Sequence, residues 1–152
     1  GFPSILGAKI GCPDTPVVGF AGDGAFGISM SEMTSCNRKE WPNITMVIFR
    51  NYQWGAEKRN SILWYDNNFI GTELDLELSY AKIAEACGFR GVTVTSQTEL
   101  TETIKDACNA QNKGITTFIE VILNQELGEP FRRDAMKKPV KVAGINSSDM
   151  QN

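Results

Sequence analysis

Short apolar stretches alternate along this chain with segments of helical periodicity, and this alternation limits the possible folds more than any other feature. Four stretches predict buried strands, at residues 17–21, 44–49, 91–95 and 116–123. Each is separated from the next by far more residues than a hairpin turn needs. The sequence therefore predicts an α/β fold, with a mainly parallel sheet and helices on both of its faces.

Helical segments fill the gaps between these strands. Apolar residues recur with helical spacing over residues 26–38 and again over 80–87. A capping box at residues 96–99 predicts the start of a third helix, which Gly114 ends. The stretch 51–78 has no clear period and is rich in aromatic residues and asparagine, so we interpret it as a long functional excursion.

The extent of the alternating strand and helix pattern predicts the domain organisation. The chain has 152 residues, which suits one domain rather than two. Residues 1–11 read as the end of a packed helix with nothing before it to pack against, and the strand pattern stops at residue 123. We therefore expect residues 1–123 to be a domain that lacks its N-terminal part, residues 124–152 to be a basic C-terminal tail, and the chain to be a fragment of a larger multidomain protein.

Composition excludes several classes of function. The net charge is −3, from 15 Lys and Arg against 18 Asp and Glu, so no basic field favours nucleic-acid binding. No apolar run approaches the roughly 18 residues of a membrane span, and no signal peptide is visible, so we expect a cytoplasmic location. The chain has no histidine, which removes Ser-His-Asp and Cys-His catalysis and most zinc sites. Its four cysteines match no metal or redox spacing and are predicted to be reduced thiols.

The turn after the first predicted strand carries the richest motif. Residues 22–27 read Gly-Asp-Gly-Ala-Phe-Gly, which matches the G-x-G-x-x-G pattern of dinucleotide-binding turns. A site for NAD needs an acidic residue at the end of the second strand, but that strand ends in Arg50 and Asn51. NADP stays open as an alternative, because the Arg50 side chain suits the 2′-phosphate of NADP. Against both stands Asp23, because a carboxylate facing a pyrophosphate needs a cation between them.

A cation site accounts for more of these residues. Asp23 and Asn51 both offer oxygen ligands, and the carboxyl ends of adjacent parallel strands lie over one pocket. Such a site suits Mg²⁺ that also holds two phosphate oxygens. Gly22 and Gly24 allow close approach of the backbone, and free N–H groups at the start of the following helix bind further phosphate oxygens.

The spacing of these residues carries a resemblance to a known family. Gly-Asp-Gly, then 26 residues, then Asn51 and the sequence Tyr-Gln-Trp-Gly resembles the thiamine diphosphate motif of the decarboxylase and acetolactate synthase superfamily. The resemblance implies thiamine diphosphate and Mg²⁺ as cofactors. It implies that Mg²⁺ is held by the side chains of Asp23 and Asn51 and by the Gln53 carbonyl. The cofactor-binding residues that it implies are Gly22, Asp23, Gly24, Ala25, Asn51, Gln53 and Gly55.

One residue departs from the superfamily pattern. The superfamily has two successive asparagines at this strand end, and Arg50 takes the place of the first of them. Two interpretations stay open: Arg50 is a structural partner for a nearby carboxylate, or it contacts an anionic substrate.

Two further stretches narrow the resemblance. Residues 51–58 and 126–140 resemble the sulfoacetaldehyde acetyltransferases, which implies conversion of sulfoacetaldehyde and phosphate into acetyl phosphate and sulfite in the breakdown of taurine and related sulfonates. Both substrates are anions, and residues 129–141 hold five Lys or Arg against two acidic residues. We therefore take Arg132 and Arg133 as candidate anion contacts. The candidate contacts beside the predicted metal ligands are Trp54 and Glu57.

The same resemblance implies that the active site is incomplete here. In this superfamily the glutamate that activates the cofactor lies in another domain, usually of a partner subunit, so we expect N-terminal domains of the same protein, a homodimer or homotetramer, and no activity of this fragment alone. Two rivals stay open. One is another thiamine diphosphate enzyme, resembling sulfopyruvate decarboxylase or acetolactate synthase, and the other is a non-catalytic nucleotide-binding module.

Overall fold

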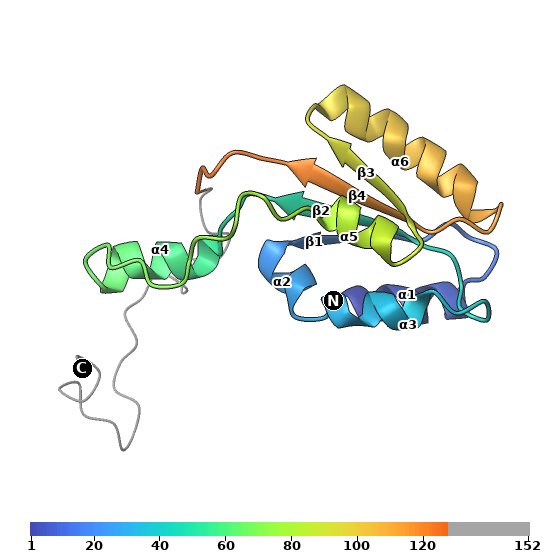
Figure 1. Ribbon diagram of the computed structural model, residues 1–152, viewed down its shortest axis with the longest axis horizontal. Coiled ribbons are helices and arrows are strands. Elements are labelled where there is room, and N and C mark those ends of the chain that lie inside the picture. The colour runs from blue at the N-terminus through green and yellow to red at the C-terminus, as the bar shows by residue number, and fades with distance from the viewer. Residues whose placement is uncertain (128–152) are drawn as a thin grey trace, which may run out of the picture.

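Four parallel strands form the centre of the fold, in a computed structural model that describes residues 1–127 (Figure 1). All three neighbouring pairs run parallel, and the strand order across the sheet is β1-β2-β4-β3. This confirms the predicted parallel sheet. The strands are β1 (Val18–Gly22), β2 (Thr45–Arg50), β3 (Arg90–Val94) and β4 (Thr117–Ile122).

Helices cover both faces of the sheet, as the apolar strands require. One face is covered by α1, α2, α3 and α5, whose buried side chains form a single core with β1, β2 and β4. The other face is covered by α6, which packs on a smaller core of strand residues. In the described part of the chain the helices are α1 (Phe2–Gly11), α2 (Asp23–Gly27), α3 (Met33–Cys36), α4 (Gly55–Trp64), α5 (Tyr80–Ala86) and α6 (Gln97–Gln111), with a 3₁₀ turn η1 (Met30–Glu32).

The single helix predicted over residues 26–38 is wrong. The structure has three short pieces there, and α2 already begins at Asp23. Glycine is a poor helix former and two glycines lie in α2, while Ser29 leaves the helical region with φ −123°. The apolar periodicity arose because Phe26, Met30 and Met33 all contact the same core from separate turns.

Two glycines allow helices to lie directly against the sheet. A β-carbon on Gly91 of β3 would lie 2.2 Å from the carbonyl oxygen of Ala81 in α5. A β-carbon on Gly19 of β1 would lie 1.7 Å from a side-chain atom of Ile5 in α1. Any larger residue at Gly91 therefore pushes α5 away from the sheet.

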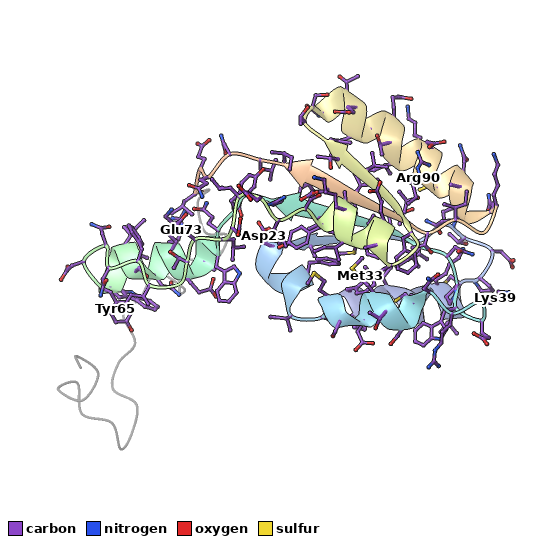
Figure 2. All side chains as sticks on the ribbon, viewed as in Figure 1. Asp23, Met33, Lys39, Tyr65, Glu73 and Arg90 are labelled. Carbon is purple, nitrogen blue, oxygen red and sulfur yellow. The ribbon has the colours of Figure 1, made fainter. Side chains whose placement is uncertain are left out.

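The excursion predicted over residues 51–78 is an ordered projecting segment (Figure 1). It holds α4, a helix of 10 residues with no buried member, and then returns beside it. The returning chain is joined to the outgoing one by two backbone hydrogen bonds, Trp54 N to Thr72 O at 2.8 Å and Leu74 N to Tyr52 O at 2.9 Å. An ion pair between Lys58 and Glu73 adds a side-chain link. Figure 2 shows Glu73 in this segment. The segment is thus tied together at its base, next to the end of β2.

Within residues 1–127, we find no helix with the length and apolar character that crossing a membrane requires.

Candidate functional site

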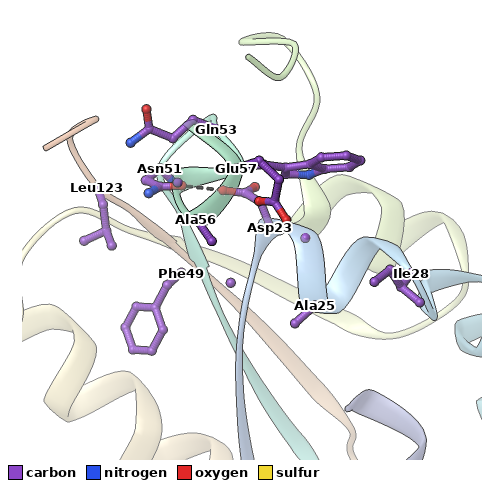
Figure 3. A pocket seen from close by; sticks show the side chains of 13 residues that line it. Asp23, Ala25, Ile28, Phe49, Asn51, Gln53, Ala56, Glu57 and Leu123 are labelled. Carbon is purple, nitrogen blue, oxygen red and sulfur yellow. Dashed lines mark hydrogen bonds between the residues drawn. The ribbon is translucent and has the colours of Figure 1, made fainter. Parts of the chain in front are cut away.

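A pocket of about 520 Å³ lies at the carboxyl ends of β1 and β2, at the base of the projecting segment (Figure 3). Parallel sheets bind ligands at this edge. The pocket brings together every predicted site residue within the described part of the chain. These are Gly22, Asp23, Gly24, Ala25, Asn51, Gln53, Trp54, Gly55 and Glu57.

Asp23 is the buried carboxylate of this pocket. Its side chain is only 4% exposed, and its Oδ2 atom accepts the backbone N–H of Asn51 at 2.8 Å (Figure 3). Its Oδ1 atom is also buried, and no residue among 1–127 forms a hydrogen bond with it. A buried carboxylate oxygen without a partner is costly, and a bound cation would satisfy it.

The Asn51 amide joins the two other predicted metal ligands. Its inward atom lies 3.1 Å from Asp23 Oδ2 and 3.0 Å from the Gln53 carbonyl oxygen. With its nitrogen inward, the amide donates a hydrogen bond to each. With its oxygen inward, three oxygens converge, and their separation is near the roughly 3 Å between neighbouring ligands of an octahedral Mg²⁺ with bonds of about 2.1 Å. Residues 23, 51 and 53 therefore form a ligand set that suits a small, hard cation.

The Gln53 carbonyl faces this set because of the residue before it. Tyr52 has φ 60°, a left-handed conformation that turns the chain sharply after β2. The Gln53 side chain then points elsewhere, and its Nε2 donates to the Gln125 carbonyl at 2.8 Å. The backbone carbonyl of Gln53, rather than its side chain, is therefore the group that faces Asn51.

Gly24 leaves open space on the pocket floor. A β-carbon there would approach only the ring of Trp54, at 3.6 Å, which is an ordinary contact. Gly24 also lacks a positive φ. Neither close packing among the described residues nor a positive φ requires a glycine here, and the backbone is open to close approach from the pocket.

The charge of the described pocket lining is negative. Its ionisable residues are Asp23 and Glu57, and no Lys or Arg among residues 1–127 lines it. Tyr80 lies beneath the site, where burial and then the Asp23 carboxylate raise the pKa of its hydroxyl, so it stays neutral. An anionic ligand in this lining therefore requires a cation beside Asp23.

No group of three His, Cys, Asp or Glu side chains lies together in residues 1–127. The three candidate ligands do not fit that pattern, because they are one carboxylate, one amide and one backbone carbonyl. The proximity of Asp23 and Asn51 was predictable from their places after two strands, whereas the Gln53 carbonyl was expected only because the family resemblance implies it.

Arg50 has a carboxylate partner, as one of its two interpretations proposed. Its Nη1 atom lies 2.6 Å from Glu120 Oε1, both side chains are buried, and Arg50 does not line the pocket. The candidate anion contacts Arg132 and Arg133 lie outside the described residues. The four cysteines are free thiols, as predicted.

Sequence reasoning missed the apolar part of the lining. It consists of Ile28, Phe49, Ala56 and Leu123. Phe49 and Leu123 lie at the carboxyl ends of predicted strands, which was the available signal. The buried Glu120 was also missed, although an acidic residue inside an apolar strand indicates a buried partner.

Comparisons with known proteins assign this chain to a family. The profile of the family described as thiamine pyrophosphate enzyme, C-terminal TPP binding domain, matches residues 1–121. A probable sulfoacetaldehyde acetyltransferase of Rhizobium meliloti is 74% identical over 99% of this chain. The sulfoacetaldehyde acetyltransferase of Rhodobacter capsulatus is 67% identical over 99% of it. The chain spans about a quarter of these relatives, 26% of each.

A solved structure shares the fold. The thiamine diphosphate-dependent 4-hydroxybenzoylformate decarboxylase of Rhodococcus jostii RHA1 matches with a TM-score of 0.73 and 26% identity, over 84% of this chain and 23% of that one. The family profile covers most of the chain and includes the whole Asp23, Asn51 and Gln53 site. The chain therefore belongs to the thiamine pyrophosphate (thiamine diphosphate) enzymes, as a part of their C-terminal cofactor-binding domain.

Proposed function

We propose that this chain is the C-terminal part of a sulfoacetaldehyde acetyltransferase that depends on thiamine diphosphate and Mg²⁺. The observation that carries the cofactor assignment is the convergence of Asp23, Asn51 and the Gln53 carbonyl at one buried point. The substrate assignment is supported by the names of the relatives that are 74% and 67% identical.

In this proposal Asp23, Asn51 and the Gln53 carbonyl would hold Mg²⁺, and the pocket beside them would hold the diphosphate. Gly22, Gly24, Ala25 and Gly55 line the pocket and contact the cofactor through their backbone. When bound there, thiamine diphosphate would supply the carbanion chemistry that cleavage of the C–S bond requires. The overall reaction balances: sulfoacetaldehyde and phosphate give acetyl phosphate and sulfite. The C–S bond and the aldehyde C–H bond are broken, while a C–O bond to phosphate and a C–H bond of the new methyl group are formed.

The substrate side of the pocket is assigned to side chains near the metal ligands. Trp54 and Glu57 border the same space, and Trp54 forms its wall above Gly24. Sulfonate and phosphate are both anions, and the lining formed by residues 1–127 has no basic residue. We therefore assign their recognition to Arg132 and Arg133, whose guanidinium groups suit tetrahedral oxyanions.

The complete enzyme in this proposal is larger than the chain. It includes N-terminal domains of the same protein, one of which supplies the activating glutamate, and it is a cytoplasmic homodimer or homotetramer. Residues 1–123 act as the diphosphate-binding unit and residues 124–152 as a tail that contributes the basic side chains. The chain alone is expected to be inactive.

The test is sulfite release from sulfoacetaldehyde by the full-length protein, supplied with thiamine diphosphate and Mg²⁺. We expect sulfite only when phosphate is present, and acetyl phosphate in equal amount. The matched control is Asp23→Asn, which keeps a hydrogen-bond acceptor for Asn51 but lacks the carboxylate charge, and it should release no sulfite. Release of carbon dioxide from a 2-oxo acid, without any sulfite release, would support the cofactor assignment and contradict sulfoacetaldehyde as the substrate.

A further inference from the structure

A buried ion pair lies directly behind the candidate metal site. Arg50 is the last residue of β2, next to Asn51, and its side chain is 4% exposed. Its partner Glu120 is 1% exposed and lies on the adjacent strand β4, 2.6 Å away. Neither residue lines the pocket, so the pair does not meet a ligand in the described lining.

Glu120 is held rigidly by several donors. Its carboxylate accepts the Ser79 hydroxyl at 2.6 Å and the first two N–H groups of α5, from Tyr80 and Ala81, at 3.2 Å each. The Thr93 hydroxyl of β3 lies at 3.4 Å. A buried carboxylate with this many donors is a fixed anchor for the Arg50 guanidinium.

The rest of the Arg50 guanidinium contacts the projecting segment. Its Nη2 atom donates to the carbonyls of Asp75 and Leu76, both at 3.1 Å. Its guanidinium carbon lies 4.4 Å from the ring centre of Tyr52, within the range of a cation–π contact. Arg50 therefore joins the sheet to both sides of the segment base.

Tyr52 is the residue that most needs this support. Its φ of 60° is unfavourable for a residue with a β-carbon, and that conformation places the Gln53 carbonyl toward Asn51 and Asp23. The Tyr52 carbonyl is also bound, by Leu74 N at 2.9 Å and Gln125 Nε2 at 3.3 Å. The ring, however, is held by Arg50.

We propose that Arg50 is a positioning residue for the metal site. Anchored by Glu120, it holds Tyr52 in its left-handed turn and so orients two of the three ligands, the Asn51 amide and the Gln53 carbonyl, toward Asp23. The inference rests on the proposed cofactor site and deepens it, because it assigns the arginine that replaces the first asparagine of the superfamily motif a role in metal affinity.

The experiment measures thiamine diphosphate binding to the full-length protein by calorimetry over a series of Mg²⁺ concentrations. Arg50→Met should raise the Mg²⁺ concentration for half-maximal binding about 10- to 100-fold, as loss of residues that orient metal ligands does. Arg50→Lys keeps the charge but not the forked contacts, and should show a smaller rise. Thermal unfolding without cofactor is measured in parallel.

Two controls separate positioning from general stability. Leu6→Ala removes a core side chain from α1, a helix that contributes no residue to the pocket lining, and Arg90→Met breaks an ion pair between β3 and Asp106 of α6. Both should leave the Mg²⁺ dependence unchanged, while Leu6→Ala lowers the unfolding temperature. An Arg50→Met protein that resembles Leu6→Ala, with lower stability and unchanged Mg²⁺ dependence, would overturn the proposal.

Substitutions of Tyr52 test the same route without breaking the ion pair. Tyr52→Leu loses the ring contact but keeps a β-carbon, so the half-maximal Mg²⁺ concentration should rise. Tyr52→Gly also lacks the ring, but glycine adopts a positive φ without strain. The half-maximal Mg²⁺ concentration should therefore rise less in this variant than in Tyr52→Leu. These two variants provide the test if Arg50→Met does not fold. Equal half-maximal Mg²⁺ concentrations for Tyr52→Leu, Tyr52→Gly and the unaltered protein would refute the positioning role. Absence of Mg²⁺-dependent binding in the unaltered protein would instead overturn the cofactor site itself.

Discussion

The Oδ2 atom of Asp23 accepts the backbone N–H of Asn51 at 2.8 Å, and this hydrogen bond joins the turn after β1 to the end of β2. The Asp23 carboxylate thus stabilises the contact between these two strand ends. It also lies beside the Asn51 amide, which in turn contacts the Gln53 carbonyl. Its second oxygen remains free of protein partners among the described residues. Structure and ligand binding can therefore be separated by substitution at this single position.

Asp23→Asn should separate the two roles. The asparagine oxygen can still accept the Asn51 N–H, so the unfolding temperature of the full-length protein should change little, whereas Mg²⁺-dependent thiamine diphosphate binding should be lost. Asp23→Ala should lose both, since it leaves a buried N–H unsatisfied at a cost of about 1–3 kcal/mol. Calorimetric unfolding and binding titrations measure the two effects. Cofactor binding by Asp23→Asn at unchanged Mg²⁺ would rule out the carboxylate as a ligand.

Gly24→Ala should weaken cofactor binding without harming the fold. The added methyl group meets only the Trp54 ring, at 3.6 Å, and replaces a glycine within α2 without positive φ. Stability should be equal or higher, by up to about 1 kcal/mol, because alanine restricts the unfolded chain. The dissociation constant of thiamine diphosphate at saturating Mg²⁺ should rise at least several-fold. Unchanged affinity would show that no ligand approaches this glycine.

Gly91→Ala should destabilise the protein. The new β-carbon would lie 2.2 Å from the Ala81 carbonyl oxygen, so α5 must move away from β3. Overpacking of this kind costs about 1–3 kcal/mol. The control is Gly7→Ala in α1, where no atom lies within 4 Å of the added carbon and the helix should gain up to about 1 kcal/mol. Thermal unfolding of both variants measures the difference, and equal unfolding temperatures would contradict the close packing of α5.

Cys36 should resist alkylation in the folded protein. Burial, and secondly the charge of Glu32, raise the pKa of its thiol from 9.0 to about 11, so at pH 8 only about a thousandth is thiolate. Peptide mapping after iodoacetamide treatment should find Cys36 unmodified at pH 8 and modified in denaturant at the same pH. Because the folded state holds this proton more tightly, the contribution of Cys36 to stability is full below pH 9 and falls as the pH rises toward 11. Rapid labelling of folded Cys36 at pH 8 would contradict its burial.

The parallel sheet and the proximity of Asp23 and Asn51 were predictable from the sequence, for a local reason. Buried strands need unbroken apolar stretches, and the carboxyl ends of parallel strands meet at one edge of the sheet. Asp23 and Asn51 each follow such a stretch directly, so their proximity requires only that β1 and β2 be neighbours, as they are. The break of the predicted 26–38 helix was not predictable in this way, because core contacts from separate turns imitate helical periodicity.

The sequence by itself determined the fold class and the edge of the sheet at which Asp23 and Asn51 lie, since both depend on spacing within short segments. Only the tertiary structure decided the partner of Arg50. Glu120 lies 70 residues further along the chain, and β4 reaches β2 only because it inserts between β2 and β3 in the sheet. Strand order depends on how helices of both layers pack, a property of the whole assembly that no local pattern contains.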